Sequence, residues 1–331
     1  MVQTLCSLVF ACDAHSRLLT SVLDGPHVVV SSPAECAKAV LARQPTLAFV
    51  DVDWLPAVQG ELANVTVIAI VEGVLEAIVD AFNAFPQLEH VITTALLSSP
   101  QAMTHLAALR TRLAEADEPL EADATYRATY IMQSGDRDAQ LEQIREFFAT
   151  HVESARRIGV IKDIAEELVT NALYDAPSEA GYFPTAVSRT VDVEFPLELA
   201  SELSYGIEAR GAFVRMRDPF GALTRGRILG VLNRCSTTEV EFDETRGGAG
   251  LGLWRVFTNA ATLSITVIPG RLTDILVWID TKKSSRASAK QLLAAHLYMP
   301  ADHPDYRMHD PFARAEDDEL NYEAFTLDKD A

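Results

Sequence analysis

The sequence has few cysteines, no excess of positive charge and no long uninterrupted apolar run. Its four cysteines (Cys6, Cys12, Cys36 and Cys235) form no CxxC pair and show no spacing typical of metal ligands. Sparse and unpaired cysteine is typical of a reducing compartment. We therefore expect buried or incidental thiols and no disulfide framework.

The lack of positive charge excludes two classes of partner. The formal net charge is −19 at pH 7, whereas non-specific binding to nucleic acid or to anionic lipid needs a positive field. The most apolar stretch, "VTVIAIVEGVLEAIVDAF", is interrupted by Glu72, Glu76 and Asp80, so we expect no segment that spans a membrane. The first residues, "MVQTLCSLVFACDAHS", have no basic start and favour a β-strand over a leader peptide. Together these features predict a soluble cytoplasmic protein.

The length predicts more than one domain. A chain of 331 residues, 48% of them hydrophobic, exceeds the usual size of one domain and can bury sizeable cores. Composition shifts divide it into a first domain (1–116), an acidic, proline-marked linker (117–126), a second domain (127–283) and an acidic tail (284–331). We expect the tail to be largely irregular, with one short helix at "SAKQLLAAHLYM".

The first domain alternates between two kinds of segment. Short β-branched runs appear at "CSLVFAC", "HVVVSS", "TLAFVDVD", "VTVIAIV" and "HVITTA". Segments with helical spacing of apolar residues lie between and after them, such as "PAECAKAVLARQ" and "VLEAIVDAFNAF". Near-continuous apolar strands alternating with helices predict an α/β fold, a parallel sheet covered on both faces.

Five such units ending on a long amphipathic helix resemble the receiver domain of bacterial response regulators. "PTLAFVDVDWLP" resembles the third receiver strand, which implies Asp51 or Asp53 as the phosphate acceptor. Of the acidic pair that binds magnesium in receivers, only Asp13 is present. Val71 or Glu72 replaces the usual hydroxyl residue, and Thr93 or Thr94 replaces the usual lysine.

Phosphoryl transfer to an aspartate needs a metal and a cation that stabilises the developing charge. Without the lysine and the full acidic pocket, we expect a pseudo-receiver used for docking or dimerisation. Phosphorylation at Asp51 or Asp53 is the alternative.

The second domain mixes strands and helices. "YRATYIMQS", "TAVSRTVDVEF", "ELSYGIEA" and "GAFVRMRD" predict strands, and "ATLSITVIPG" with "RLTDILVWIDT" predicts a closing hairpin. "DAQLEQIREFFATHVESA" and "GVIKDIAEELVTNALYDA" space apolar residues three and four apart, as amphipathic helices do. This order predicts an α+β two-layer sandwich.

One of these helices carries a polar pair. Glu167 and Asn171 in "EELVTNALYDA" are four residues apart and therefore share a helical face. An amide oxygen suits magnesium, and a carboxylate can deprotonate a water or a hydroxyl. Taken alone, such a pair is more typical of a solvated polar face.

Two further motifs follow along the chain. "VRMRDPFGAL" takes Asp218 out of a strand into a turn with Gly221, which is either an ordinary β-turn or an adenine contact. "RGGAGLGLWRVF" contains Gly248, Gly250 and Gly252 just before a helix, whose N-terminus favours an anion. A glycine-rich turn by itself is weak support for a phosphate site.

These three motifs, in this order, resemble the GHKL ATPases, the superfamily of gyrase, Hsp90 chaperones, histidine kinases and MutL-type ATPases. The resemblance covers about residues 127–282 and is nearest to the anti-sigma-factor serine kinases. It implies a GHKL (Bergerat) fold, ATP and Mg²⁺ as cofactors, and Glu167 as general base. It also implies that Asn171 holds magnesium and that Asp218, with Gly221, reads adenine.

The same resemblance implies the phosphate contacts. They are the backbone of the glycine-rich stretch (Gly248, Gly250, Leu251 and Gly252) and the side chains of Arg225 and Arg246 in or beside an ATP lid. The family usually has a basic residue three or four places after the asparagine, where this chain has Tyr174 and Asp175. The sequence therefore leaves turnover of bound ATP open.

We expect a bacterial signal-transduction protein that binds Mg–ATP and regulates a protein partner. Phosphorylation of a serine or threonine on that partner would make it a kinase, and self-association as a homodimer would fit the receiver-like half. The alternatives are a non-catalytic nucleotide-gated scaffold and a degenerate histidine kinase without its dimerisation helices.

Overall fold

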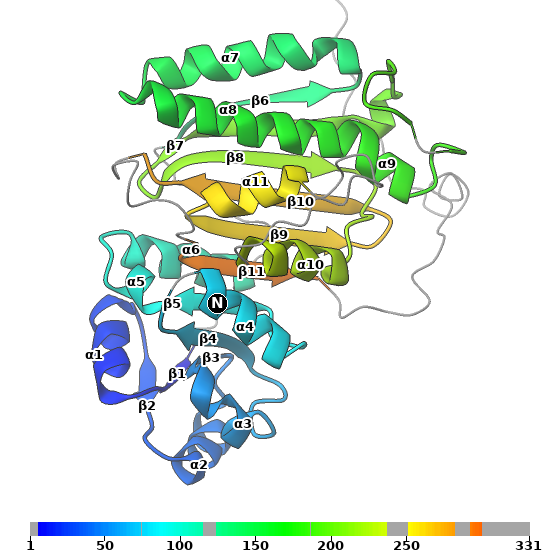
Figure 1. Cartoon of the computed structure of the whole chain (residues 1–331). Helices are drawn as coiled ribbons and strands as arrows, with labels where there is room; N and C mark the ends of the chain where they lie inside the picture. The colour runs from blue at the N-terminus through cyan, green and yellow to red at the C-terminus, as the bar shows by residue number, and fades with distance from the viewer. Residues whose placement is uncertain are drawn as a thin grey trace, which may run out of the picture.

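One large mixed sheet organises the molecule. The structure, a computed structural model, describes residues 6–73, 75–114, 124–185, 187–236, 251–281 and 292–299. Within these ranges eleven strands form a continuous sheet in the order β2-β1-β3-β4-β5-β11-β9-β10-β8-β7-β6 (Figure 1). The expectation of a mixed α/β protein is confirmed at this level.

The N-terminal half of the sheet is parallel. Its strands are β1 (Ser7–Phe10), β2 (His27–Val29), β3 (Leu47–Asp51), β4 (Thr66–Val71) and β5 (His90–Thr93). All four neighbouring pairs run parallel, and the order 2-1-3-4-5 is one of the common doubly wound arrangements. The alternation of strands and helices in the sequence predicts a parallel sheet, and the structure has one here.

Helices cover both faces of this parallel half. They are α1 (Asp13–Val22), α2 (Pro33–Arg43), α3 (Leu55–Val58), α4 (Leu75–Ala84), α5 (Thr94–Leu97) and α6 (Ala102–Ala114). Successive strand residues point to opposite faces. Val9 and Phe49 accordingly pack in one core with Leu19 of α1, whereas Val50 belongs to the core on the other face, with Ile78 of α4.

The C-terminal half of the sheet is antiparallel from β9 outward. It contains β9 (Thr262–Ile268), β10 (Leu272–Ile279), β8 (Gly211–Asp218), β7 (Ser201–Glu208) and β6 (Thr125–Ile131). The helices are α7 (Arg137–Ala149), α8 (Ala155–Thr170), α9 (Ala176–Glu179), α10 (Arg225–Ser236) and α11 (Leu251–Asn259). Figure 1 shows α7, α8 and α11 in front of the sheet, which gives the two layers expected for this half.

A strand from the tail joins the two halves. β11 (Ala294–Tyr298) lies between β5, to which it is antiparallel, and β9, to which it is parallel. The helix predicted at "SAKQLLAAHLYM" is therefore wrong for its last residues. Alanine and leucine favour helix locally, but here the strand has a neighbour on each side, and tertiary pairing overrides that preference.

A second secondary-structure expectation also fails. "TAVSRTVDVEF" alternates like a strand, yet its described residues form turns and extended backbone, with one isolated bridge between Glu194 and Gln133. Arg189 in this segment pairs with Asp175 at 2.9 Å, and Val191 accepts a hydrogen bond from the Tyr174 hydroxyl at 3.0 Å. The segment therefore contacts the residues just after α8 and, apart from that bridge, does not extend the sheet.

The two halves also meet through helices. α10 packs against α4, and Asn83 donates a hydrogen bond to Asn233 at 2.7 Å across this contact. One continuous hydrophobic core includes Val50 and Ile78 from the first half and Ile164 and Phe257 from the second. The halves are thus joined by a strand, a helix pair and a shared core.

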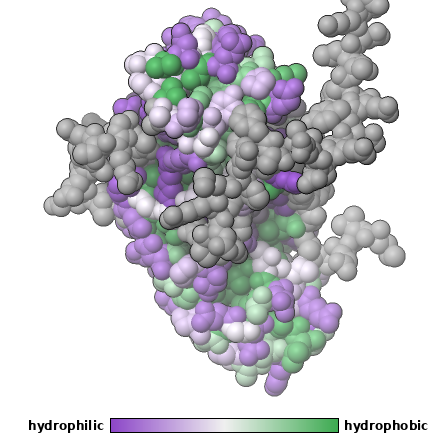
Figure 2. Space-filling model, turned by 90° about the vertical axis from the view of Figure 1, so that its right-hand side faces the viewer, coloured by the Kyte–Doolittle hydropathy of each residue, from purple (hydrophilic) through white to green (hydrophobic). Residues whose placement is uncertain are grey.

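On the side shown in Figure 2, hydrophilic and hydrophobic side chains are interspersed over the described surface. Within the residues that the structure describes, no helix is long and apolar enough to cross a lipid bilayer.

Candidate nucleotide-binding site

The polar pair of α8 lies at a break in helical geometry. Asn171–Asp175 continues α8 as a π-helical turn before α9 begins. Single π-helical turns are frequent at functional sites because they change the direction of the following side chains. Glu167 is on the last regular turn of α8, and Asn171 is the first residue of the π-helical turn.

Asn171 has a buried amide atom without a hydrogen bond. Its Nδ2 atom is buried and has no partner in the part of the chain that the structure describes. Leaving such a group unsatisfied costs about 1–3 kcal/mol. A half-turn of the amide about its last torsion exchanges Nδ2 for Oδ1, so the same position can present an oxygen to a cation. The residue fits the magnesium role that the resemblance implies.

Glu167 lies directly against the start of α11. A Cβ atom added to Gly252 would overlap the Glu167 carboxylate, so only glycine fits there without moving the acid. Arg255, one turn further along α11, places its Nη1 atom 3.4 Å from Glu167 Oε1. The first and third sequence motifs are therefore side by side, 85 residues apart along the chain but in contact through two packed helices.

The electrostatics of Glu167 favour proton transfer. Burial raises the pKa of its carboxyl group, while Arg189 and Arg255 pull it down and Glu166 and Asp175 push it up. A raised carboxyl pKa brings the group nearer to neutral pH, where a general base works best.

Asp218 is buried at the end of β8. Its Oδ1 atom accepts a hydrogen bond from the Phe220 amide at 3.0 Å. Burial raises its pKa to about 7, against the opposing effect of the Phe220 and Gly221 amides. The hydroxyl of Thr273, directly opposite in register, also lowers the pKa, although its Oγ1 does not reach hydrogen-bond geometry. A buried carboxyl group that titrates near neutrality is a frequent feature of functional sites.

Gly221 has a structural reason to be glycine. Its φ angle is +56°, and an added Cβ would overlap the carbonyl oxygen of Ile268, the last residue of β9 before the β9–β10 turn. Its own carbonyl accepts a hydrogen bond from the Gly270 amide at 3.2 Å. The turn after Asp218 is thus fixed against that hairpin, and β8 in turn packs against the π-helical turn of Asn171.

The structure places Arg225 away from these residues. Its guanidinium group donates to the carbonyl oxygen of Leu88 and lies 5.6 Å from the ring centroid of Phe82. Both partners belong to the N-terminal half, so Arg225 links α10 to α4 and to the loop before β5. These contacts accompany the burial of Arg225, and its contact with a phosphate stays a prediction.

The acidic residue after Asn171 is neutralised by the protein itself. Asp175 pairs with Arg189 at 2.9 Å and lies 3.9 Å from Arg227, which also pairs with Glu179. An aspartate next to a triphosphate is repulsive, and these two cations reduce that repulsion. Sequence reasoning missed both arginine partners, because Arg189 and Arg227 lie 14 and 52 residues from Asp175.

Part of the glycine-rich motif lies outside the described residues. Arg246, Gly248 and Gly250 belong to it, and nothing in the structure bears on them. Leu251 begins α11, and Gly252 is the second residue of that helix.

The N-terminal half of the molecule contains the two aspartates expected as phosphate acceptors, and one of them is held in place by hydrogen bonds. Asp51 is buried at the end of β3, where its Oδ2 accepts from the Cys12 amide at 2.7 Å and its Oδ1 lies 2.7 Å from His15 Nδ1. Asp53 is exposed in the 3-10 turn Val52–Trp54, and Asp13 is exposed at the start of α1. Of these three acids, only Asp51 is buried.

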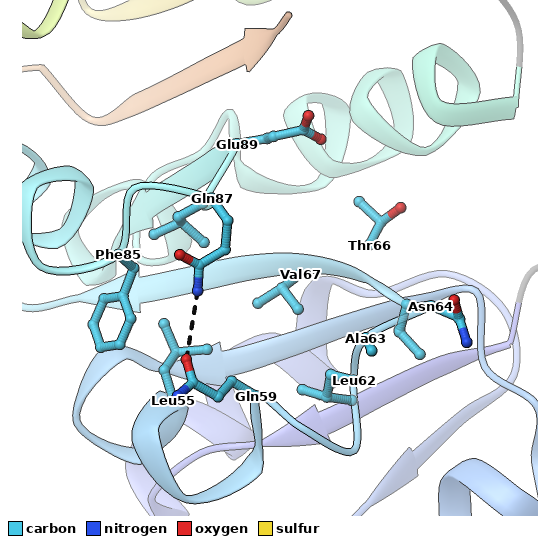
Figure 3. A pocket seen from close by; sticks show the side chains of 12 residues that line it. Leu55, Gln59, Leu62, Ala63, Asn64, Thr66, Val67, Phe85, Gln87 and Glu89 are labelled. Carbon is cyan, nitrogen blue, oxygen red and sulfur yellow. Dashed lines mark hydrogen bonds between the residues drawn. The ribbon is translucent and has the colours of Figure 1, made fainter. Parts of the chain in front are cut away.

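A separate cavity of about 400 Å³ lies in the N-terminal half (Figure 3). It is lined by Leu55, Gln59, Leu62, Ala63, Asn64, Val65, Thr66, Val67, Phe85, Gln87, Leu88 and Glu89. Gln87 donates a hydrogen bond to Gln59 across it at 3.4 Å. None of the residues expected to bind nucleotide lines this cavity, but Leu88, whose carbonyl holds Arg225, does.

Comparison with protein-family models and with curated proteins finds no match to this chain. The function is therefore inferred from the residues and their geometry.

Proposed function

We propose that this chain is an ATP-binding signalling protein that regulates a protein partner in a Mg–ATP-dependent manner. The observation that carries the proposal is the meeting of Glu167, Asn171 and Gly252 where α8, its π-helical turn and α11 come together. Asp218 lies at the end of β8, the strand that packs against the same π-helical turn.

Each residue has a role that its surroundings support. Asn171 presents a buried amide nitrogen with no partner among the described residues, and a half-turn of the amide would put its oxygen there for a metal bound to phosphates. Magnesium would neutralise part of the triphosphate charge. Asp218 would accept the exocyclic amine of adenine, and that contact would favour its ionised form and lower its pKa. The first turn of α11, which begins at Leu251, would offer backbone amides to the phosphates.

The same residues support phosphoryl transfer to a partner. Glu167 would take the proton from a serine or threonine hydroxyl as the γ-phosphoryl group moves to that oxygen and ADP leaves. Its raised pKa is in keeping with a base that must accept this proton near neutral pH.

A non-catalytic nucleotide-gated scaffold is the second candidate. It is favoured by the ion pair between Glu167 and Arg255, because the carboxylate that would act as the base is already paired with a cation. It is also favoured by the contact of α10 with α4, because α10 begins at Arg225, which the resemblance puts in or beside the ATP lid. Nucleotide would then act by changing how the two halves present themselves to a partner or to a second copy of the chain.

Turnover and binding, measured separately, distinguish the two candidates. We expect Glu167→Gln to bind ATP as the wild type does and to lose at least about 100-fold in hydrolysis or transfer, the lower end of the range for a general base. Asp163→Asn is the matched control, since Asp163 is exposed one turn earlier on α8. If the wild type binds ATP without turnover, only the scaffold function remains. If it does not bind ATP at all, both candidate functions are refuted.

A further inference from the structure

Three different donor groups meet at the carboxyl ends of strands β1 and β3. Cys12 and His15 follow β1, and Asp51 ends β3. One ligand atom from each lies within 4.8 Å of the other two. The cluster therefore combines sulfur, nitrogen and oxygen donors in a space the size of a metal coordination sphere.

The two inner ligands are buried and the third faces solvent. His15 and Asp51 are 9% and 7% exposed, whereas Cys12 is exposed. The Asp51 carboxylate is held by the Cys12 amide, which donates to Oδ2 at 2.7 Å. An ion could thus reach the site from the Cys12 side and find two ligands already oriented.

The histidine ring is bounded by carboxylates on both sides. Its Nδ1 atom lies 2.7 Å from Asp51 Oδ1, and its Nε2 atom lies 3.3 Å from Glu72 Oε1. A neutral imidazole carries one N–H and cannot donate to both. With a metal ion on Nδ1, the single proton is on Nε2 and is donated to Glu72. Ligating histidines usually show this arrangement, with the second ring nitrogen donating to a carboxylate.

We propose that Cys12 Sγ, His15 Nδ1 and Asp51 Oδ1 bind a zinc-type divalent transition metal, with Glu72 as the carboxylate that orients His15. Thiolate and imidazole ligands select Zn²⁺ over Mg²⁺, which prefers an octahedral shell of oxygens. Binding releases the thiol proton of Cys12 and replaces the hydrogen bond from His15 to Asp51 by ligation. A water completes the four-coordinate shell.

The site is distinct from the proposed nucleotide site. It uses two residues that follow β1, the last residue of β3 and a residue just after β4, and none of the ATP-site residues contributes a ligand. The thiol and imidazole also differ from the all-oxygen ligands of a magnesium-dependent phosphate acceptor. Asp51 would serve as a metal ligand in this half of the molecule.

The experiment is a metal titration of the full-length chain after chelator treatment. Zn²⁺ affinity is measured by competition with a chromophoric chelator, and Co²⁺ is used as a spectroscopic probe because a thiolate ligand adds a sulfur-to-cobalt charge-transfer band. We expect one Zn²⁺ per chain, that band with Co²⁺, and no displacement by excess Mg²⁺.

Variants test the assignment ligand by ligand. Cys12→Ser should remove the charge-transfer band, and His15→Gln should weaken Zn²⁺ binding at least 10-fold. Glu72→Gln should weaken it about 10–100-fold. Cys6→Ser and His27→Gln are matched controls that should change neither signal. Unfolding curves without metal show whether each variant folds like the wild type.

Failure of Zn²⁺ to bind the wild type would overturn the proposal. So would a Co²⁺ spectrum without the thiolate band, or a Cys12→Ser variant that folds normally and retains both band and affinity. None of these outcomes bears on ATP binding in the other half.

Discussion

The Glu167 carboxylate lies against the α-carbon of Gly252, so closely that no side chain fits between them. This contact fixes α11 on α8 and sets where the acid lies relative to the start of α11. Glycine is therefore needed at position 252 to leave room for the Glu167 carboxylate, and not only to make the preceding glycine-rich sequence flexible.

Gly252→Ala should therefore impair function more than stability. Alanine favours a helix over glycine by about 1 kcal/mol, but here its methyl group must push the flexible Glu167 carboxylate aside. We expect a Tm close to that of the wild type and a clear loss of ATP turnover, or of ATP affinity if the protein is a scaffold. Gly159→Ala on α8 is the control, because nothing lies within 4 Å of its added Cβ. The Gly159→Ala variant should gain stability and keep its nucleotide function. If Gly252→Ala also kept ATP turnover and affinity, the Glu167–Gly252 contact would not matter for function.

Gly221→Ala should destabilise the fold. The substitution meets both a φ of +56° and the backbone carbonyl of Ile268, which cannot move as a side chain can. We expect a loss of about 2–3 kcal/mol in the free energy of unfolding, measured in urea. Gly181→Ala separates the two causes, because its φ is +76° but nothing lies within 4 Å of the added Cβ. Its cost should be only about 1 kcal/mol, and equal losses at the two sites would show that the Ile268 contact is unimportant.

Three buried histidines should make the junction between the halves sensitive to acid. His105 Nε2 and His296 Nε2 share a hydrogen bond at 3.0 Å, and His90 lies opposite His296 in the β5–β11 pairing. Burial lowers the pKa of His90 and of His105 to about 3, and that of His296 well below its usual value. The nearby cations Arg112 and Arg210 act in the same direction.

The direction in which stability changes with pH follows from the number of protons bound by the folded and the unfolded chain. Below the unfolded pKa of 6.5 the unfolded chain binds protons that the folded chain does not, so stability falls as the pH falls from 6.5 toward 3. Each histidine contributes a slope of up to about 1.4 kcal/mol per pH unit. Asp218 has the opposite effect, because its pKa of about 7 in the folded chain lets the folded chain bind one proton that the unfolded chain does not bind at the same pH.

Urea unfolding between pH 7.5 and 5 measures this dependence. His90→Phe should flatten the pH dependence, because it removes one buried base while keeping an aromatic ring beside Tyr298, 4.9 Å away between centroids. His27→Phe is the control at an exposed position. A steep pH dependence that His90→Phe leaves unchanged would show that the acid sensitivity arises elsewhere.

The parallel half of the fold could be predicted because its signal is local. Each strand of that half is a short apolar run between helical segments. In the other half, the polar face of α8 could be predicted in the same way, from residues four apart. The position of β11 could not be predicted. "LLAAHLYM" has helical preference, and its strand pairs with β5, about 200 residues earlier. The His90, His105 and His296 cluster depends on the same distant pairing.

The candidate sites divide in the same way. Glu167, Asn171 and Asp218 could be chosen from the order of their motifs. The π-helical turn, the arginine partners of Asp175 and the inward position of Arg225 arise from packing between segments distant in sequence. Cys12 and His15 gave no recognisable spacing, because their third partner, Asp51, is on another strand.

The measurement that tests the central claim most directly is a calorimetric titration of Mg–ATP and Mg–GTP into the wild type and Asp218→Ala. A carboxylate that accepts the exocyclic amine of adenine distinguishes adenine from guanine, whose six-position carries an oxygen. The account predicts that the wild type binds ATP and prefers it to GTP by at least 10-fold, and that Asp218→Ala loses both the affinity and the preference. A wild type that binds neither nucleotide, or an Asp218→Ala variant that retains the preference, would contradict it.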